Sequence, residues 1–328
     1  MTSPRGGSAR YCIVGGAGFI GSHMVDALLA DDAVERVTVF DNFSSGRRWH
    51  LEHHGGDRRL RVVEDDVRDL GALVAAMDGA QSVIHLASNP DIARAATEPA
   101  VDFDLGTLLT HHVVEAARIS GTGRVLYASG SGVYGDLGEL EADEDFGPLV
   151  PVSTYGASKL AGEALIASYC FMFDLSGAVF RFGNVVGPRQ THGVGYDFVR
   201  RLLAEPAELP ILGDGRQSKS YVHVSDIVDA VLLAGERAPR PFAAFNVATG
   251  DYITVKEIAD LAVEVVGTTG TVYRFSGGDR GWKGDVPVVR LNTDRIRALG
   301  WANAMSSRQA LEASLRSMLD DARSGRLT

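Results

Sequence analysis

A tyrosine and a lysine in the segment Tyr155-Gly156-Ala157-Ser158-Lys159 have the spacing of an acid–base pair. Residues four apart project from the same face of a helix, so the phenol of Tyr155 and the ammonium of Lys159 would point into one pocket. A neighbouring positive charge favours the phenolate, and a phenolate can take a proton from a sugar hydroxyl while a nicotinamide takes the hydride. The segment therefore predicts a hydride-transfer site, although the same pattern also occurs on ordinary amphipathic helices.

A glycine-rich run, GGAGFIG at residues 15–21, lies between an expected strand and an expected helix. Glycines at 15, 18 and 21 would let the backbone approach a pyrophosphate, whose negative charge the helix N-terminus favours. The next strand ends in Asp41, about 20 residues on, where a carboxylate would bind the adenine ribose 2′-hydroxyl and repel a 2′-phosphate. We therefore expect NAD rather than NADP, against the simpler interpretation that Asp41 only begins a turn.

Further residues at the ends of the expected strands would line this cofactor. Asp66 follows the third strand and could face the adenine amino group, and small residues after the fourth strand would leave room for the cofactor backbone. His85, within that strand, is expected to be a core histidine rather than a catalyst. The residues expected to bind the cofactor are Gly15, Gly18, Phe19, Ile20, Gly21, Asp41, Asn42, Ser44, Gly46, Asp66, Val67, Leu86, Ala87, Ser88, Tyr155, Lys159 and Phe182.

Short β-branched runs alternate with amphipathic stretches up to Asn184. The expected strands are 11–14, 36–40, 60–63, 82–86, 124–128 and 175–182, and the expected helices are 20–29, 70–77, 105–119 and 155–173. This alternation predicts an α/β fold with a Rossmann-like, doubly wound parallel sheet. Later residues show glycine- and proline-rich loops and two helices, 225–236 and 255–266. We expect a disordered lead (1–10), an NAD-binding domain (11–184, with later segments interleaved) and a smaller, mostly C-terminal α/β substrate lobe (185–328).

Composition narrows the function classes. The 328 residues are 45% hydrophobic and 23% charged, as in ordinary globular proteins, and the formal net charge of −10 argues against nucleic acid or an anionic membrane as partner. The two cysteines, Cys12 and Cys170, lie in apolar sequence without metal-ligand spacing, so we expect reduced core thiols, no disulfide and no metal. Neither a signal peptide nor a membrane-spanning run is visible, which favours a cytoplasmic location.

The ordered motifs resemble those of the NAD-dependent nucleotide-sugar epimerase/dehydratase family of extended short-chain dehydrogenases/reductases. The likeness extends over nearly the whole chain after Arg10, includes RFGNVVGPR at 181–189 and GDRGWKGD at 278–285, and is closest to UDP-glucose 4-epimerase-like and UDP-glucuronate 4-epimerase-like members. It implies that Tyr155 is the catalytic base and acid and that Lys159 holds the nicotinamide ribose. The substrate would be bound by Ser131, Tyr155, Asn184, Lys219, Arg280 and Lys283. Lys219 stands where the family usually has an arginine.

One position departs from the family pattern. The family's serine or threonine, three residues before a Val-Tyr-Gly triplet, falls on Gly130 in the segment Ser129-Gly130-Ser131. Either Ser129 or Ser131 takes over the proton exchange with the substrate, or water does, or Tyr155 acts alone; we favour Ser131. The same strip lines the C6 end of the sugar in related enzymes, so the absence of side chains at Gly130 and Gly132 would leave room for a C6 carboxylate.

The resemblance implies an NDP-sugar 4-epimerase that passes through a transient 4-keto sugar with tightly bound NAD. The substrate would be UDP-linked, as glucose/galactose or glucuronate/galacturonate. Family dehydratases place Asp-Glu where this chain has Ser131-Gly132, which disfavours dehydration. A UDP-glucuronate decarboxylase remains an alternative, and a non-catalytic NAD-binding regulator is the alternative from another class. The surplus apolar residues of helices 105–119 and 155–173 indicate a homodimer.

Overall fold

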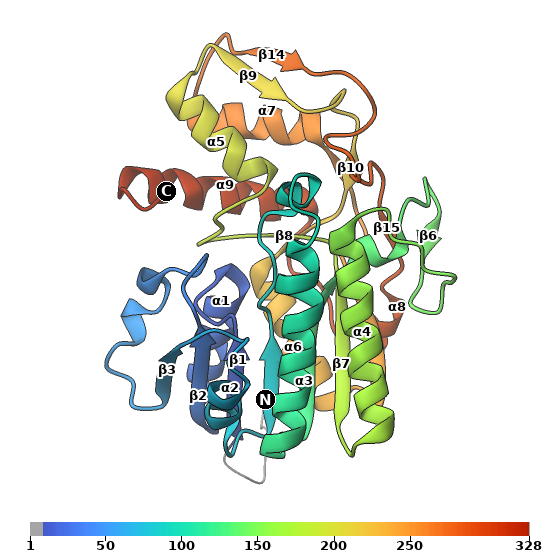
Figure 1. Ribbon diagram of the computed structural model, residues 1–328. Coiled ribbons are helices and arrows are strands. Elements are labelled where there is room, and N and C mark those ends of the chain that lie inside the picture. Colours follow the sequence, from blue (N-terminus) through green and yellow to red (C-terminus); the bar gives the residue numbers. More distant parts are fainter. Residues whose placement is uncertain (1–8, 328) are drawn as a thin grey trace. The chain divides into compact units, whose positions relative to one another are not determined.

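The computed structural model describes residues 9–327, and its largest sheet has seven strands (Figure 1). The strands are β1 (Ala9–Val14), β2 (Val34–Asp41), β3 (Leu60–Glu64), β4 (Ser82–His85), β5 (Arg124–Gly130), β7 (Ser176–Phe182) and β12 (Phe242–Val247). Their order is β12-β7-β5-β4-β1-β2-β3, and the pairings from β3 across to β5 are parallel. Because the chain winds outward in both directions from β1, the predicted doubly wound fold is confirmed.

Three helices cover one face of this sheet: α2 (Leu70–Met77), α3 (Leu108–Ser120) and α4 (Thr154–Met172), while α1 (Phe19–Leu29) follows β1 (Figure 1). Alternate strand residues, such as Cys12 and Val14 of β1 and Val125 and Tyr127 of β5, pack with residues of α2, α3 and α4 in one apolar core. Both cysteines lie in this core and form no disulfide, as expected. Burial raises the pKa of the Cys12 thiol to about 12 and that of Cys170 to about 11.

Several element boundaries differ from the sequence prediction, among them the starts of α3 and β1. Helix α3 begins at Leu108, because Phe103–Thr107 forms a π-helical turn ahead of it. Strand β1 begins at Ala9, whose amide donates to the carbonyl of Ala33, so the end of the expected lead is part of the sheet. The rest of that lead lies outside the described residues.

Contacts divide the chain into two compact units that exchange segments. The first comprises the chain up to Ser129 with Ser158–Phe180 and Val231–Ala244, and the second comprises Gly130–Ala157, Arg181–Ala230 and Phe245–Thr328. The predicted boundary at residue 184 is therefore crossed by two segments, 130–157 and 231–244, which group with the opposite part of the chain.

The second unit has its own apolar core, built chiefly from α5 (Val194–Ala204), α7 (Val255–Val266) and α9 (Ser307–Arg323). The remaining helices are α6 (Val224–Arg237) and α8 (Asp294–Ala298), and the short strands are β6 (Glu141–Ala142), β8 (Asn184–Val186), β9 (Glu208–Ile211), β10 (Ser218–Lys219), β11 (Tyr221–His223), β13 (Ile253–Thr254), β14 (Val272–Phe275) and β15 (Arg290–Leu291). The short strands pair as β6/β15, β8/β11, β9/β14 and β10/β13. Across residues 9–327, none of the helices combines the length and apolar character needed to cross a membrane.

Candidate active site

The glycine-rich turn packs backbone against backbone where β1, α1 and β4 meet. Gly15 has φ +85°, and a Cβ built on it would stand 2.7 Å from the amide nitrogen of Ala87. A Cβ on Gly21 would run into the carbonyl oxygen of Gly15. Helix α1 starts from Gly18 without a side-chain cap, which leaves its first amides available to an anion. The turn thus has the shape and polarity that a pyrophosphate requires.

Asp41 ends β2 beside this turn. Its Oδ2 accepts the Ala17 amide at 2.9 Å and its Oδ1 accepts the Phe43 amide at 2.8 Å. Burial raises the pKa of this carboxyl, and the two backbone hydrogen bonds oppose that rise. Since each carboxylate oxygen can accept a second hydrogen bond, the fixed side chain can still receive ribose hydroxyls.

The end of β4 adds an unsatisfied polar group to the same turn. The amides of Leu86 and Ala87 both donate to the carbonyl of Val14, at 2.8 and 3.0 Å. The hydroxyl of Ser88 is buried and has no hydrogen-bond partner among the described residues. A buried hydroxyl without a partner is costly unless a ligand completes it. Together with the uncapped helix and Asp41, Ser88 fits a bound dinucleotide.

Asp66, the residue predicted to contact adenine, is paired with a neighbouring arginine. Arg68 donates to both carboxylate oxygens of Asp66, at 2.8 and 2.7 Å, and this arginine holds the pKa of Asp66 below its usual range. The amide of Asn42 also donates to Asp66, at 3.2 Å. A contact between Asp66 and adenine stays a prediction.

The other expected cofactor residues differ in exposure. Phe19, Gly46, Val67 and Phe182 are buried, Ile20 is partly buried, and Ser44 is exposed.

Lys159 is buried inside the first unit, on α4. Only 3% of the residue is exposed, its Nζ donates to the carbonyl of Ala128 at 2.8 Å, and it lies 5.1 Å from the centre of the Tyr127 ring. Burial lowers the pKa of Lys159 to about 8, and the carboxylates of Asp102 and Glu163 oppose this effect. A lysine in this state remains an ammonium at neutral pH but sits close to losing its proton.

Asp102 and Glu163 were missed by the sequence analysis. Both are buried, and the side-chain amide of Asn89 donates to Asp102 at 2.8 Å. Glu163 lies one helical turn beyond Lys159, so the α4 pitch alone could have identified it. Asp102 comes from a distant segment for which the sequence carries no comparable signal.

His85 is a core residue, as expected. It is fully buried, its Nε2 lies 3.0 Å from the hydroxyl of Thr110, and it stacks on Tyr127. Burial, with a smaller contribution from Lys159, lowers the pKa of His85 to about 3, so the imidazole is neutral. Its Nδ1 has no hydrogen-bond partner within residues 9–327, so only one of its two ring nitrogens is hydrogen-bonded there.

Tyr155 lies in the first turn of α4, four residues before Lys159, and is partly exposed. The two serines near the departing glycine have different surroundings. Ser129 is buried and donates to Glu163 at 2.5 Å, whereas Ser131 is partly exposed at the start of the 3₁₀-helix Ser131–Tyr134. Between them Gly130 is extended, and a Cβ built on it would meet no atom within 4 Å. Ser131 therefore keeps the more accessible hydroxyl.

Two of the predicted substrate cations of the second unit, Lys219 and Arg280, contact the buried residue Asp285. Lys219 Nζ lies 2.7 Å from Oδ1 of Asp285, which is 3% exposed, and 5.4 Å from the centre of the Trp282 ring. Arg280 donates to the carbonyl of Asp285 at 2.6 Å. Lys283 is exposed in the same loop. Oδ2 of Asp285 also accepts the Gly281 amide at 3.0 Å, so Asp285 orders this loop, in which Arg280 is in addition paired with Asp136.

Two further residues complete the picture of this unit. Asn184, the predicted diphosphate ligand, is partly exposed and begins β8, which pairs with β11.

Arg290 is a cation that the sequence analysis missed. Its guanidinium lies 3.9 Å from the centre of the Tyr252 ring and donates to the carbonyl of Ser218 at 3.2 Å. No motif marks Arg290, because only its stacking and its strand position distinguish it from other arginines.

Comparisons with known proteins show what the sequence and the fold are similar to. The profile of the NAD dependent epimerase/dehydratase family matches residues 11–248. A UDP-glucose 4-epimerase of Mycolicibacterium smegmatis is 35% identical over 300 residues, covering 89% of this chain and 93% of that protein. The crystal structure of a UDP-galactose 4-epimerase has a TM-score of 0.84 at 36% identity, covering 95% of this chain and 99% of that one. A dTDP-glucose 4,6-dehydratase of Streptomyces venezuelae, solved with NAD bound, has a TM-score of 0.90 at 28% identity, covering 97% and 100%.

Proposed function

Because the chain belongs to the NAD-dependent epimerase/dehydratase family, whose members act on nucleotide sugars, we propose that it is a 4-epimerase of UDP-linked hexoses or hexuronates. The substrate pairs are UDP-glucose/UDP-galactose and UDP-glucuronate/UDP-galacturonate. Overall similarity does not distinguish an epimerase from a dehydratase, since relatives of both kinds match most of the chain. The distinction has to come from individual side chains.

Ser131-Gly132 supports epimerisation over dehydration. Elimination across C5 and C6 needs an acid/base pair, which family dehydratases place as Asp-Glu at these two positions. A Cβ on Gly132 would already stand 3.5 Å from the Cα of Gly156, so a longer side chain there would meet the first turn of α4. Neither position carries a carboxylate that could remove a proton from C5.

The buried ammonium of Lys159 is the observation that carries the proposal. Its charge lies one helical turn from Tyr155, where it favours the phenolate that takes the proton from the sugar 4-hydroxyl and later returns it. When bound, NAD would supply a reversible acceptor for the C4 hydride, so it would be regenerated in each turnover. Asn184, Lys219 and Arg280 hold the nucleoside diphosphate, and Ser131 shares the proton at the 4-hydroxyl.

The open space beside Gly130 favours a substrate with a substituted C6 position. A serine or threonine side chain would occupy this space, whereas glycine leaves room for a carboxylate. UDP-glucuronate is therefore the first uronate to test, alongside UDP-glucose.

A product assay tests the proposal. Purified protein is incubated with UDP-glucose, UDP-glucuronate, UDP-N-acetylglucosamine and dTDP-glucose, and the sugars are separated. We expect the C4 epimer without net reduction of added NAD, and a Tyr155→Phe variant that keeps its NAD but is slower by roughly 10²–10⁴-fold. A UDP-pentose would instead indicate a decarboxylase, a 4-keto-6-deoxy sugar a dehydratase, and bound NAD without turnover of any sugar a regulator.

We also propose that two copies of the chain associate through α3 and α4. The ends of these helices carry large exposed apolar side chains, including Phe171 at 73% and Met172 at 71% exposure on α4 and Ile119 at 48% on α3. Both helices lie side by side on the same face of the sheet (Figure 1). A two-fold contact would cover these side chains.

A further inference from the structure

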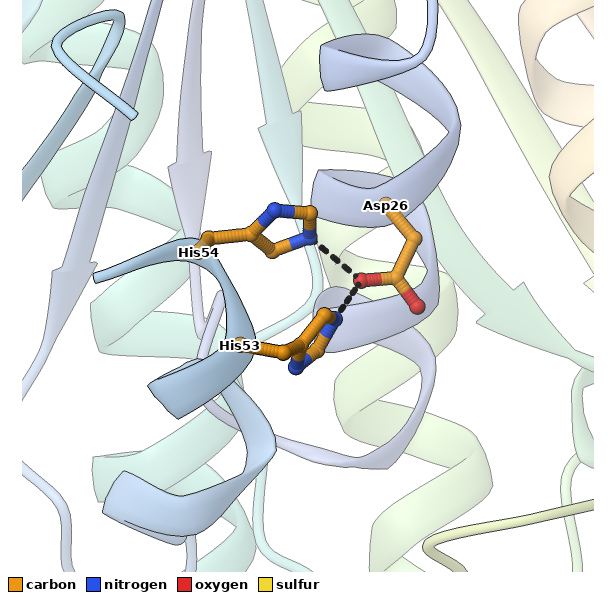
Figure 2. A group of neighbouring side chains, drawn as sticks. All are labelled: Asp26, His53 and His54. Atoms are coloured by element: carbon orange, nitrogen blue, oxygen red, sulfur yellow. Dashed lines mark hydrogen bonds and ion pairs between the residues drawn. The ribbon is translucent and has the colours of Figure 1, made fainter. Parts of the chain in front are cut away.

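Asp26, His53 and His54 form a compact cluster in the first unit, apart from the cofactor and substrate residues (Figure 2). The Nε2 atoms of His53 and His54 each lie 2.8 Å from the same carboxylate oxygen, Oδ1 of Asp26. The two imidazole rings are tilted against each other with centroids 4.1 Å apart. Two imidazoles and a carboxylate therefore converge on one point.

The cluster joins two separate elements of the fold. Asp26 projects from α1, the helix that begins at the glycine-rich turn, and His53 and His54 lie on the 3₁₀-helix Glu52–His54 in the connection between β2 and β3. His23, one turn earlier on α1, stands with its Nδ1 4.0 Å from the second oxygen of Asp26. The side chains remain reachable from solvent, with His53 51% and Asp26 31% exposed.

We propose that Asp26, His53 and His54 bind a divalent transition-metal ion, with Zn²⁺ as the preferred occupant and water completing its coordination. Imidazole nitrogen and carboxylate oxygen are the ligands that Zn²⁺ takes at about 2.0–2.2 Å, so tetrahedral ligand atoms stand roughly 3.3 Å apart. The three ligand atoms of the cluster all lie within 4.8 Å of one another, and each imidazole nitrogen is 2.8 Å from the carboxylate oxygen. Side-chain shifts of about 1 Å or less would bring them to a metal.

The ligand set also selects among metals. Mg²⁺ and Ca²⁺ prefer oxygen ligands throughout, whereas two imidazoles suit Zn²⁺, Ni²⁺ and Cu²⁺. The cluster has no thiol, which disfavours the softer Cu⁺ ion.

The position of the cluster suggests what a bound metal would do: it would fix the connection between β2 and β3, which contains residues expected to bind the cofactor. The connection after β2 runs from Asp41 to the two histidines and contacts the glycine-rich turn that precedes α1. The amide of Arg47 donates to the carbonyl of Ala17 in that turn at 3.0 Å, and His50 Nδ1 lies 2.8 Å from the same oxygen. A metal at Asp26, His53 and His54 would join the far end of this connection to α1. We therefore expect metal binding to slow amide hydrogen exchange in residues 42–54 and to slow the release of NAD.

Direct metal titration of the full-length, NAD-loaded protein tests this proposal. The protein is prepared without a histidine tag, stripped with a chelator and dialysed, and Zn²⁺ is titrated in competition with a chromophoric chelator. We expect one Zn²⁺ per chain, a Tm increase of roughly 3–6 °C at saturating metal, and visible absorption bands of tetrahedral character when Co²⁺ replaces Zn²⁺.

Matched variants locate the ion. His53→Ala and His54→Ala should each weaken Zn²⁺ binding at least tenfold, and the near-isosteric Asp26→Asn should do the same with little change in the Tm of the metal-free protein. His111→Ala is the control, because His111 is an exposed member of the His111-His112 pair on α3, outside the cluster, and it should bind as the parent does. Absence of stoichiometric binding in the parent, or equal affinity in the parent, the cluster variants and the control, overturns the proposal.

Discussion

The hydroxyl of Ser129 donates to the carboxylate of Glu163 at 2.5 Å, and both residues are buried within the first unit. The bond ties the end of β5 to α4 next to the buried ammonium of Lys159. It uses the Ser129 hydroxyl for internal structure, because a hydroxyl has a single proton to donate. Ser131 is left as the serine whose hydroxyl is partly accessible.

Replacing the two serines separately should distinguish a proton partner from a structural residue. We expect Ser131→Ala to lower kcat by roughly 10–100-fold with a small change in stability, because it removes a proton-sharing group from the substrate. Ser129→Ala should keep kcat within about threefold and cost about 1.5–3 kcal/mol of unfolding free energy, because it removes a hydrogen bond to a charged group. Steady-state kinetics and urea unfolding of both variants provide the comparison, and a larger loss of kcat in Ser129→Ala would reverse the assignment.

Lys159 should set the alkaline limit of activity. Its ammonium has a pKa of about 8, so the charge that favours the Tyr155 phenolate disappears as pH rises through that value. We expect kcat to fall above about pH 8 and Lys159→Met to lower kcat at least 100-fold at neutral pH. A pH profile of the parent that stays flat to pH 10 contradicts this role.

The same residue predicts a pH-dependent stability. Between pH 8 and 10.5 the unfolded chain holds a proton on Lys159 that the folded chain has lost, so the contribution of this residue to stability rises with pH in that window. Burying the Lys159 ammonium lowers the free energy of unfolding by an amount on the order of 3 kcal/mol, and this destabilisation is fully present below pH 8. Urea unfolding should therefore give Lys159→Met a higher free energy of unfolding than the parent at pH 7.5, and the difference should be smaller at pH 10. A gap independent of pH counts against a buried ammonium.

Asp41 should decide between the two dinucleotides. Its carboxylate is held by the amides of Ala17 and Phe43, and a 2′-phosphate would be repelled there. Asp41→Asn keeps the shape but removes the charge, so we expect NAD affinity to fall about 10–100-fold and the preference for NAD over NADP to shrink. Binding titrations with both dinucleotides measure the ratio of NAD affinity to NADP affinity. An unchanged ratio would show that Asp41 only stabilises the turn.

Lys219 should act on substrate binding more than on turnover. We expect Lys219→Ala to raise KM for the UDP-sugar at least tenfold with kcat within about threefold, because a diphosphate contact is made equally before and during the reaction. Lys219→Arg should restore most of the affinity through a forked guanidinium. Lys256→Ala, an exposed lysine of the same unit paired with Asp260, is the control and should leave KM unchanged. A fall in kcat alone would assign Lys219 to another role.

The proposed dimer depends on the apolar ends of α3 and α4. Phe171→Asp should shift the protein from dimer to monomer in light scattering coupled to size-exclusion chromatography, because burying a carboxylate in an apolar contact is costly. Leu140→Asp, at an exposed apolar position outside these helices, should leave the dimer intact. A parent protein that is monomeric at micromolar concentration would contradict the proposed dimer.

Local patterns account for the parts of the fold that were predicted with accurate bounds. Helix α7 spans Val255–Val266 as expected, and it begins with a capping box in which Thr254 and Glu257 satisfy each other's backbone amides. The glycine-rich turn was equally readable, because only residues without side chains fit where Gly15 and Gly21 lie. In both places neighbours in the sequence decide the conformation.

Some elements escaped the sequence analysis. Strand β12 at the edge of the sheet was missed, as were α5 and α9 of the second unit's core, although α9 begins with a capping box formed by Ser306 and Gln309.

By itself, the sequence determined the alternating α/β order, the dinucleotide turn with Asp41, and the helical spacing of Tyr155 and Lys159. Only the tertiary structure decided that Ser129 points to Glu163, that Asp102 lies near Lys159, and that Asp26 meets His53 and His54. Helical and strand periodicity relate residues that are only a few positions apart, so they can be recognised in the sequence. Contacts between distant segments depend on how the whole core packs, so side chains of ordinary type acquire their roles only there.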